Sequence, residues 1–311
     1  MIFERHPGGP ILTRADIPDH PPEIIDASAV FNPGVTLWRD RIVALLRVQT
    51  RGRRTFLLRA SSQDGLHFDI DPSPVVFEGL ELVKGRIYHL YDARLTVIDD
   101  ELLVCFAMDM ADGCRLALAR SRDFERFEFV GISNDDLRNG VLFPERIGGR
   151  YTRLERPNTV GDSLAGGGDA IRLAYSENLV DWNTGPEVLR GRPHYWDERI
   201  GSGPPPVKTP EGWLHIYHGV ATHFGASSLY QAGVLLLDLD DPSKIIARGR
   251  DNILEPRESW ELRGQVPGVV FPTGLIVREG VVDLYYGAAD TSVGLARGSV
   301  DRLISACRIE E

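Results

Sequence analysis

The feature that most constrains the fold of this 311-residue chain is a loose internal repeat, with a period of roughly 45–60 residues. Each copy has a strand ending in Ala or Arg-Ala, then Ser or Gly, an acidic residue, and an apolar or aromatic residue that begins the next strand. A period of this length is typical of solenoids and propellers. Four clear copies and a diverged fifth cover residues 56–69, 115–129, 171–184, 293–304 and, for the diverged copy, 231–249.

Between these copies the chain is rich in short runs of Val, Ile, Leu, Tyr and Phe bounded by Gly, Asp and Pro, and long helical periodicities are hard to find. The pattern therefore predicts an all-β protein, and five repeats predict a five-bladed β-propeller. We expect one catalytic domain over 1–311, with an N-terminal arm at 1–28 and blades near 28–75, 86–131, 139–190, 198–250 and 264–305.

The charge composition indicates which kinds of binding partner are unsuited to this protein. Lys and Arg total 35 against 45 Asp and Glu, a formal charge of −10, which argues against nucleic acid or an anionic membrane as the principal partner. Charges and prolines fill the N-terminus where a signal peptide needs an apolar region, and no run approaches the ~18 apolar residues of a membrane span. We expect a cytoplasmic protein. The Pro-rich arm before Ala29 leaves a homo-oligomer open, since it is available to pack on a neighbouring subunit.

One short stretch, His89–Val97, combines a carboxylate and a guanidinium at the start of an apolar run. In a strand, Asp92 and Arg94 point to the same face because the side-chain period is two. The inner strand of each propeller blade lines the central channel, so polar residues near its entrance converge on one axial site. Asp92 is therefore the candidate catalytic acid. The competing interpretation is an Asp and an Arg that close a turn at a strand entrance.

Eight motifs in chain order carry a resemblance to a known family. They are N-P-G followed by L-L-R, Y-D-A-R, R-N-G-V-L-F-P, L-x-R-P, G-x-G-P-P-P-x-K-T-x-x-G-W-L-x-x-Y-H-G, L-L-D-L-D-x-P-x-K, V-x-F-P-T-G and Y-Y-G-A-A-D-T. Together they resemble glycoside hydrolase family 130 from about Phe31 to Arg297. The resemblance implies a five-bladed propeller and an inverting enzyme acting on β-mannosides. Many members are phosphorylases, a glycosyl-transferring class, that release α-mannose 1-phosphate.

The resemblance also implies roles for individual residues. Asp92 falls on the family's acid, whose proton is proposed to travel through the sugar 3-hydroxyl. Phosphate is itself the nucleophile and needs a cationic cradle rather than a base, so we expect inorganic phosphate as co-substrate and no metal or organic cofactor. The phosphate-binding positions implied are Arg138, Arg156 and Lys208, and His218 either joins them or only satisfies a hydrogen bond in the core.

A second set of positions resembles the family's sugar contacts. Hydroxyl-rich ligands need paired donors and acceptors, because a buried polar group without a partner costs about 1–3 kcal/mol. The expected ligand is a β-mannoside disaccharide or oligosaccharide. Its expected contacts are Asn32, Arg47, Tyr91 and Asp290 to hydroxyl groups, with Tyr230 and Phe271 as apolar faces, Phe271 being equally suited to plain core packing.

Three interpretations compete with a phosphorylase. A glycosidase of another five-bladed family would use two or three carboxylates on inner strands, where only Asp92 and Asp290 are well placed. An inverting β-mannosidase of the same fold would need a further carboxylate base for water, for which Asp109, Asp162 and Asp169 are candidates. A carbohydrate-binding propeller without activity would have no reason to assemble Asp92 with three basic residues.

The chain departs from the family pattern in two places. No His follows Arg156-Pro157 as it does in some mannoside phosphorylases, which leaves the exact sugar specificity open, and Ala93 stands where relatives often have Pro. The Gly-rich stretch 161–168 is expected to be a rim loop. The acceptor sugar, the linkage and the chain-length preference stay open, because rim loops that vary freely form the leaving-group subsite.

Overall fold

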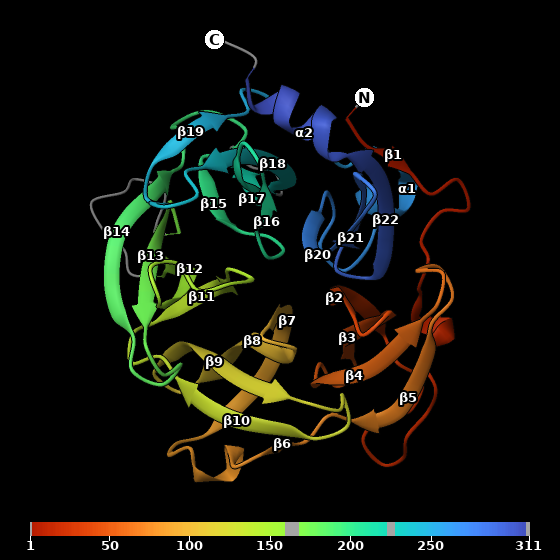
Figure 1. Cartoon of the computed structure of the whole chain (residues 1–311). Helices are drawn as coiled ribbons and strands as arrows, with labels where there is room; N and C mark the ends of the chain where they lie inside the picture. The colour runs from red at the N-terminus through yellow and green to blue at the C-terminus, as the bar shows by residue number, and fades with distance from the viewer. Residues whose placement is uncertain (1, 159–167, 223–227, 309–311) are drawn as a thin grey trace.

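The computed structural model describes residues 2–158, 168–222 and 228–308, and in it five sheets surround a common axis (Figure 1). The predicted five-bladed β-propeller is confirmed. In the order of the chain, the first two blades are built from strands that follow one another from the axis outward. Blade one contains β2 (Ala29–Trp38), β3 (Arg41–Gln49), β4 (Thr55–Ser62) and β5 (Asp69–Pro74); blade two contains β7 (Ile87–Ile98), β8 (Glu101–Met110), β9 (Gly113–Ser121), β10 (Phe127–Ile132) and the short β6 (Phe77–Glu78). The described strands of the five sheets pair antiparallel except for β6, which pairs with β10 in parallel.

The third and fourth blades repeat this order. In blade four the inner position is divided, because both β15 and β16 pair with β17. Blade three contains β11 (Leu137–Leu142), β12 (Tyr151–Pro157), β13 (Ala170–Ser176) and β14 (Asn183–Arg190); blade four contains β15 (Arg199–Ser202), β16 (Val207–Thr209), β17 (Gly212–Ala221), β18 (Leu229–Leu237) and β19 (Ile245–Arg248).

Blade five is closed by the other end of the chain. Its strands β20 (Val270–Arg278), β21 (Val281–Ala288) and β22 (Ser292–Ser299) are followed by the helix α2 (Val300–Cys307), and the outer place is taken by β1 (Glu4–Arg5). The fifth repeat therefore does not continue into a fourth strand as its sequence suggested, because Ser299 accepts a hydrogen bond from the backbone of Arg302 and caps a helix instead. The N-terminal and C-terminal segments meet in one sheet.

The repeated Ser and acidic residue have a structural explanation. In blade one, Ser62 accepts a hydrogen bond from the backbone of Gly65, and Asp64 accepts from Leu66 and His67. Ser121 with Asp123 and Ser176 with Asn178 form the same turn in blades two and three. The side chains replace the backbone partners that a tight turn leaves unpaired, and this is why the pattern recurs between the third and fourth strands.

Apolar clusters fill each junction between neighbouring blades, so the core is a ring of five interfaces. The N-terminal arm contributes Leu12, Ile17 and Ile24 to the junction of blades five and one. The arm therefore packs on its own chain, where the sequence had left a neighbouring subunit open. Outside the strands lie α1 (Ser259–Leu262) and short 3₁₀ turns at Arg14–Asp16 and Leu80–Leu82. Among the described residues no helix is long and apolar enough to cross a bilayer.

Candidate active site

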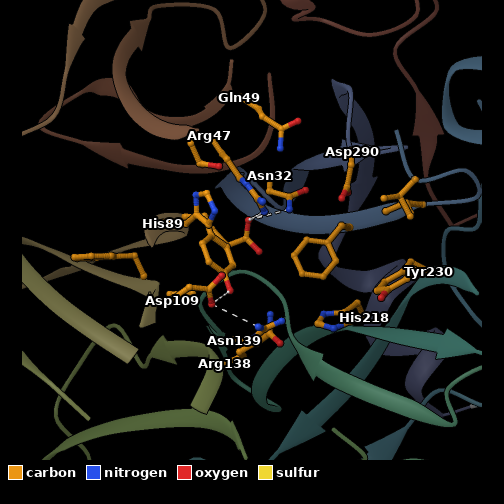
Figure 2. A pocket seen from close by; sticks show the side chains of 18 of the residues that line it. Asn32, Arg47, Gln49, His89, Asp109, Arg138, Asn139, His218, Tyr230 and Asp290 are labelled. Carbon is orange, nitrogen blue, oxygen red and sulfur yellow. Dashed lines mark hydrogen bonds and ion pairs between the residues drawn. The ribbon is translucent and has the colours of Figure 1, made fainter. Parts of the chain in front are cut away.

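A pocket of about 420 Å³ collects side chains from all five blades (Figure 2). Blades one, two and three contribute from their inner strands and from the strands next to them, blade four from β17 and β18, and blade five from β20 and neighbouring loops. All but one of the site residues expected from the sequence line this pocket. They are Asn32, Arg47, Tyr91, Asp92, Arg138, Arg156, His218, Tyr230, Phe271 and Asp290.

β-Bulges on the inner strands explain why polar side chains turn into the pocket. The pairing of β2 with β3, of β7 with β8 and of β11 with β12 each skips two inner-strand residues near the axis. The first skipped residues, Asn32, Asp92 and Asn139, have φ values of 46°, 54° and 51°. Asn and Asp tolerate this left-handed region better than other side chains, and a bulge re-aims the residue that it carries. The same local device thus presents one polar group from each of three adjacent blades.

Asp92 is held through one of its two oxygens. Its Oδ1 accepts a hydrogen bond from Nδ2 of Asn32 at 2.9 Å and another from Nη1 of Arg47 at 2.8 Å. The Arg47 guanidinium is itself fixed between two rings, 4.4 Å from the centre of Phe31 and 4.6 Å from that of Tyr91. Oδ2 of Asp92 has no hydrogen-bond partner among the described residues, so a ligand in the pocket can bind it.

Arg94 stabilises the backbone of the bulge that carries Asp92. Its side chain is buried, and its Nη1 donates to the carbonyl oxygen of Asp92 at 2.7 Å. Its Nε donates to the carbonyl oxygen of Gly203 at 2.9 Å, so the guanidinium joins blade two to blade four. The two residues of the Asp-x-Arg motif therefore have different tasks: Asp92 faces the pocket and Arg94 fixes the backbone that carries it.

Asp290 is the second carboxyl group of the pocket. It follows β21 and has a φ of 50°, as the bulge residues do. Burial raises the pKa of Asp290 to about 6, the Arg47 guanidinium opposes this rise, and the charge of Asp92 adds to it. The two carboxyl groups thus differ in surroundings: Asp92 accepts hydrogen bonds from a guanidinium and an amide, whereas Asp290 has a pKa raised by burial.

This difference predicts a pH dependence of stability. A carboxyl group whose pKa rises from 3.8 to about 6 on folding costs stability as the pH rises through that window, because the folded state then holds a proton that the unfolded state has released. We expect Asp290→Asn to gain up to about 2–3 kcal/mol in free energy of unfolding, relative to wild type, between pH 4 and pH 8. Urea unfolding at several pH values measures this. A difference that stays constant with pH would show that Asp290 is not the group concerned.

Two guanidinium groups form the cationic side of the pocket. Arg138 on β11 and Arg156 on β12 are direct partners in the sheet, which places like charges opposite each other, an unfavourable arrangement without an anion between them. Burial and the neighbouring Arg138 charge lower the pKa of Arg156 to about 10, so it stays charged at neutral pH. The Nε atoms of both residues are buried and have no hydrogen-bond partner in the described part of the chain. Such a pair suits an anion from solution.

An aromatic wall lies on the side of blades four and five. The His218 ring is 4.5 Å from Phe271, and Tyr230 lies 6.2 Å from each of them, measured between ring centres. Burial and the charge of Arg156 hold the pKa of His218 well below its usual value, so the imidazole is neutral. Its Nδ1 is buried and has no hydrogen-bond partner among the described residues. Phe271 is 8% exposed, and it packs against His218 while lining the pocket.

Lys208 is the predicted site residue that the structure does not bring to the pocket. It pairs with Trp213 on β17, whereas the pocket residue His218 lies five residues further along that strand, roughly 17 Å at the usual rise. Its Nζ is 2.6 Å from Oε1 of Glu145, and both side chains are about half exposed. The Pro-rich segment after Ser202 ends β15, and Lys208 follows on β16, which pairs with the part of β17 farther from His218.

The pocket also contains polar residues that the sequence did not single out as site residues. Gln49 follows Arg47 by two positions, and His89 precedes Tyr91 by two, so strand alternation would have placed both on the pocket side. Asp109, a candidate base, does line the pocket. Asp169 instead pairs with Arg190 at 2.8 Å. Asp162 and nearly all of the Gly-rich stretch lie outside the described residues.

A pocket with paired donors and acceptors around a carboxylate, beside a guanidinium pair, suits a hydroxyl-rich ligand together with an anion. Comparison with known proteins agrees with this class. The chain belongs to glycoside hydrolase family 130, since the family model described as beta-1,4-mannooligosaccharide phosphorylase matches residues 3–309. The resemblance seen in the eight motifs is thereby confirmed.

Individual relatives share much of the length. A 1,2-beta-oligomannan phosphorylase of Thermoanaerobacter sp. (strain X514) is 35% identical over 76% of both chains, and a beta-1,4-mannooligosaccharide phosphorylase of Ruminococcus albus is 29% identical over 97% of this chain and 90% of its own. The structure of the beta-1,2-mannobiose phosphorylase of Listeria innocua with beta-1,2-mannobiose covers 100% of both chains, at 28% identity and a TM-score of 0.87. A structure described under glycoside hydrolases that target beta-1,2 mannosidic linkages has a TM-score of 0.82 at 24% identity, which bears on the fold alone.

Proposed function

We propose that this protein is an inverting phosphorylase that cleaves a β-mannosidic bond with inorganic phosphate, giving α-D-mannose 1-phosphate and a shortened sugar acceptor. Family membership and the phosphorylase names of its relatives support the reaction class. The observation that carries the proposal is the pocket itself, which Asp92 lines together with Arg138 and Arg156, two guanidinium groups whose buried Nε donors are unpaired among the described residues.

The geometry suggests a division of labour. Phosphate held by Arg138 and Arg156 attacks the anomeric carbon, the carbon–oxygen bond to the acceptor breaks, and the departing oxygen takes a proton that originates at Asp92. By resemblance to the family, this proton passes through the sugar 3-hydroxyl. Asn32 and Arg47 keep Oδ1 of Asp92 occupied, so the proton is carried on Oδ2 toward the ligand. No protein base is required, because phosphate is already an anion.

A hydrolase on the same fold is the second candidate, and Asp109 is the observation that favours it. This carboxylate lines the pocket and would be placed to activate a water molecule. However, its Oδ1 already accepts a hydrogen bond from the Tyr91 hydroxyl at 2.7 Å and lies 3.5 Å from Nη2 of Arg138. A guanidinium pair of this kind is also more than a water nucleophile needs. We therefore favour the phosphorylase.

The deciding experiment is incubation of the protein with β-1,2- and β-1,4-linked mannobiose, with and without inorganic phosphate. A phosphorylase produces mannose 1-phosphate in proportion to phosphate, whereas a hydrolase releases free mannose at the same rate in both conditions. The reverse reaction, with α-mannose 1-phosphate and a panel of mannose, glucose, N-acetylglucosamine and longer mannosides, identifies the acceptor from the phosphate released.

The cradle also predicts an asymmetry between two basic residues. Arg156→Ala is expected to raise the Michaelis constant for phosphate about 10–100-fold, because a hydrogen bond to a charged group is worth about 1.5–3 kcal/mol. Lys208→Ala is the matched control: it removes the same charge from an exposed ion pair with Glu145, so the constant should change less than about twofold. Initial rates at varied phosphate measure both. If both variants raise the Michaelis constant for phosphate equally, Lys208 is a phosphate-binding residue after all.

A further inference from the structure

The cationic side of the pocket also contains a carboxylate, that of Asp109. Asp109, near the end of β8, faces Arg138 in Figure 2, where a dashed line joins the two side chains. Its carboxylate also accepts a hydrogen bond from the Tyr91 hydroxyl. Both contacts use Oδ1, at 3.5 Å to Arg138 and 2.7 Å to Tyr91. Within the described residues Oδ2 has no hydrogen-bond partner, and the side chain is 30% exposed. One oxygen is thus fixed by the protein and the other is accessible to a ligand.

A carboxylate beside an anion site is unfavourable unless a proton lies between the two anions. At neutral pH inorganic phosphate still carries at least one O–H group, whereas sulfate is fully ionised and carries none. A carboxylate oxygen accepts a hydrogen bond from the phosphate O–H, and the same oxygen repels sulfate with no compensating bond. Arg138 and Arg156 cannot make this distinction, since both ligands present similar oxygens to a guanidinium.

We propose that Asp109 is a specificity-determining residue that makes this anion site accept protonated oxyanions, phosphate and its analogue arsenate, and reject sulfate. The inference rests on the proposed phosphorylase function, and it assigns Asp109 a role other than activating water. The Tyr91 hydroxyl and Arg138 hold Oδ1 so that Oδ2 is directed to the ligand. Selectivity here arises from a repulsive element as much as from an attractive one.

The test compares phosphate as substrate with sulfate as competitor. Steady-state phosphorolysis gives the Michaelis constant for phosphate and the inhibition constant for sulfate in wild type, Asp109→Asn and Asp109→Ala. We expect the ratio of the sulfate constant to the phosphate constant to fall by about 10–100-fold in both variants. In Asn the amide oxygen stays with Tyr91 and Arg138, so an NH2 donor replaces Oδ2, and Ala has no polar atom there. Each variant thus loses the acceptor at Oδ2 and the charge that repels sulfate. Arsenate should follow phosphate in all three proteins.

Asp112→Asn provides the matched control. Asp112 lies three residues further along the chain, is 70% exposed, and pairs with Arg115 at 2.7 Å outside the pocket. This variant changes the net charge by the same amount, so its ratio of constants should equal that of wild type. Circular dichroism and thermal unfolding of each variant check that the fold is retained.

The outcomes separate the inference from the function on which it rests. Wild-type protein that releases mannose without regard to phosphate would end the phosphorylase proposal. Phosphate-dependent wild type with an unchanged ratio in the Asp109 variants would overturn the inference alone. If the variants have too little activity for kinetics, calorimetric titration with phosphate and with sulfate gives the same ratio from binding, and an unchanged value there is equally decisive against the inference.

Discussion

Asp92→Asn is expected to lower kcat/KM for phosphorolysis of an unactivated mannoside by about 10²–10⁴-fold, the range typical of a positioned acid. The amide keeps an oxygen that accepts hydrogen bonds from Asn32 and Arg47, so the shape of the site is retained while the proton is lost. Product formation from mannobiose and phosphate, followed as mannose 1-phosphate, measures the effect.

A mannoside with a good leaving group supplies the control for this prediction. On an aryl mannoside, whose phenolate departs without a proton, the variant should lose far less activity than it does on mannobiose. Only the poor leaving group depends on the acid. Thermal unfolding should change little. Near-normal phosphorolysis of mannobiose would reject Asp92 as the acid, and Asp290, which burial gives a pKa of about 6, would become the better candidate.

The Asp-x-Arg motif shows that the roles of its two residues could not be assigned from the sequence alone. The motif Tyr91-Asp92-Ala93-Arg94 predicted a shared face for Asp92 and Arg94, but a bulge at this point separates them. Asp92 lines the pocket, whereas the buried Arg94 donates a hydrogen bond to the carbonyl oxygen of Asp92. Strand alternation is a reliable guide only where the register is regular, and inner-strand entrances are the places where it is broken.

The repeat and the period of two account for most of what could be predicted. Four clear copies of the repeat and a diverged fifth indicated the number of blades, and the motifs placed ten residues in one pocket. Gln49 and His89 follow the same alternation, so their place in the pocket could have been predicted from the sequence. The position of Lys208 could not, because nothing in the letters G-P-P-P-V-K-T shows that β15 ends before the lysine.

Blade five was predictable as a repeat but not in its closure. Its sequence copy gave no sign that Val300–Cys307 is helical or that Glu4–Arg5 would supply the outer strand. Two residues of strand are too few for any periodicity to detect. Their place is decided by the partner they meet, and Arg5 is held there by Glu261 at 2.8 Å and 2.9 Å, a long-range contact that local sequence does not encode.

Closure leads to the second large prediction: a chain ending at Gly264 should lose cooperative folding altogether. This truncation removes β20, β21, β22 and α2 and leaves β1 without a partner. It also removes one side of two of the five apolar junctions, those of blade five with blades four and one. A propeller is stable only when its last blade meets its first, so the loss spreads around the ring.

A single substitution in the same blade gives the scale against which this loss is judged. Thr273 donates a buried hydrogen bond to the carbonyl oxygen of Pro33 at 2.7 Å, joining blade five to blade one. Thr273→Val should lower the free energy of unfolding by about 1–3 kcal/mol and keep one sharp transition. The truncated chain should show none in urea, with the circular dichroism of a largely unfolded protein. If the truncated chain instead unfolds in one sharp transition, the blades behave as a linear array in which each contact is local, and closure contributes little to stability.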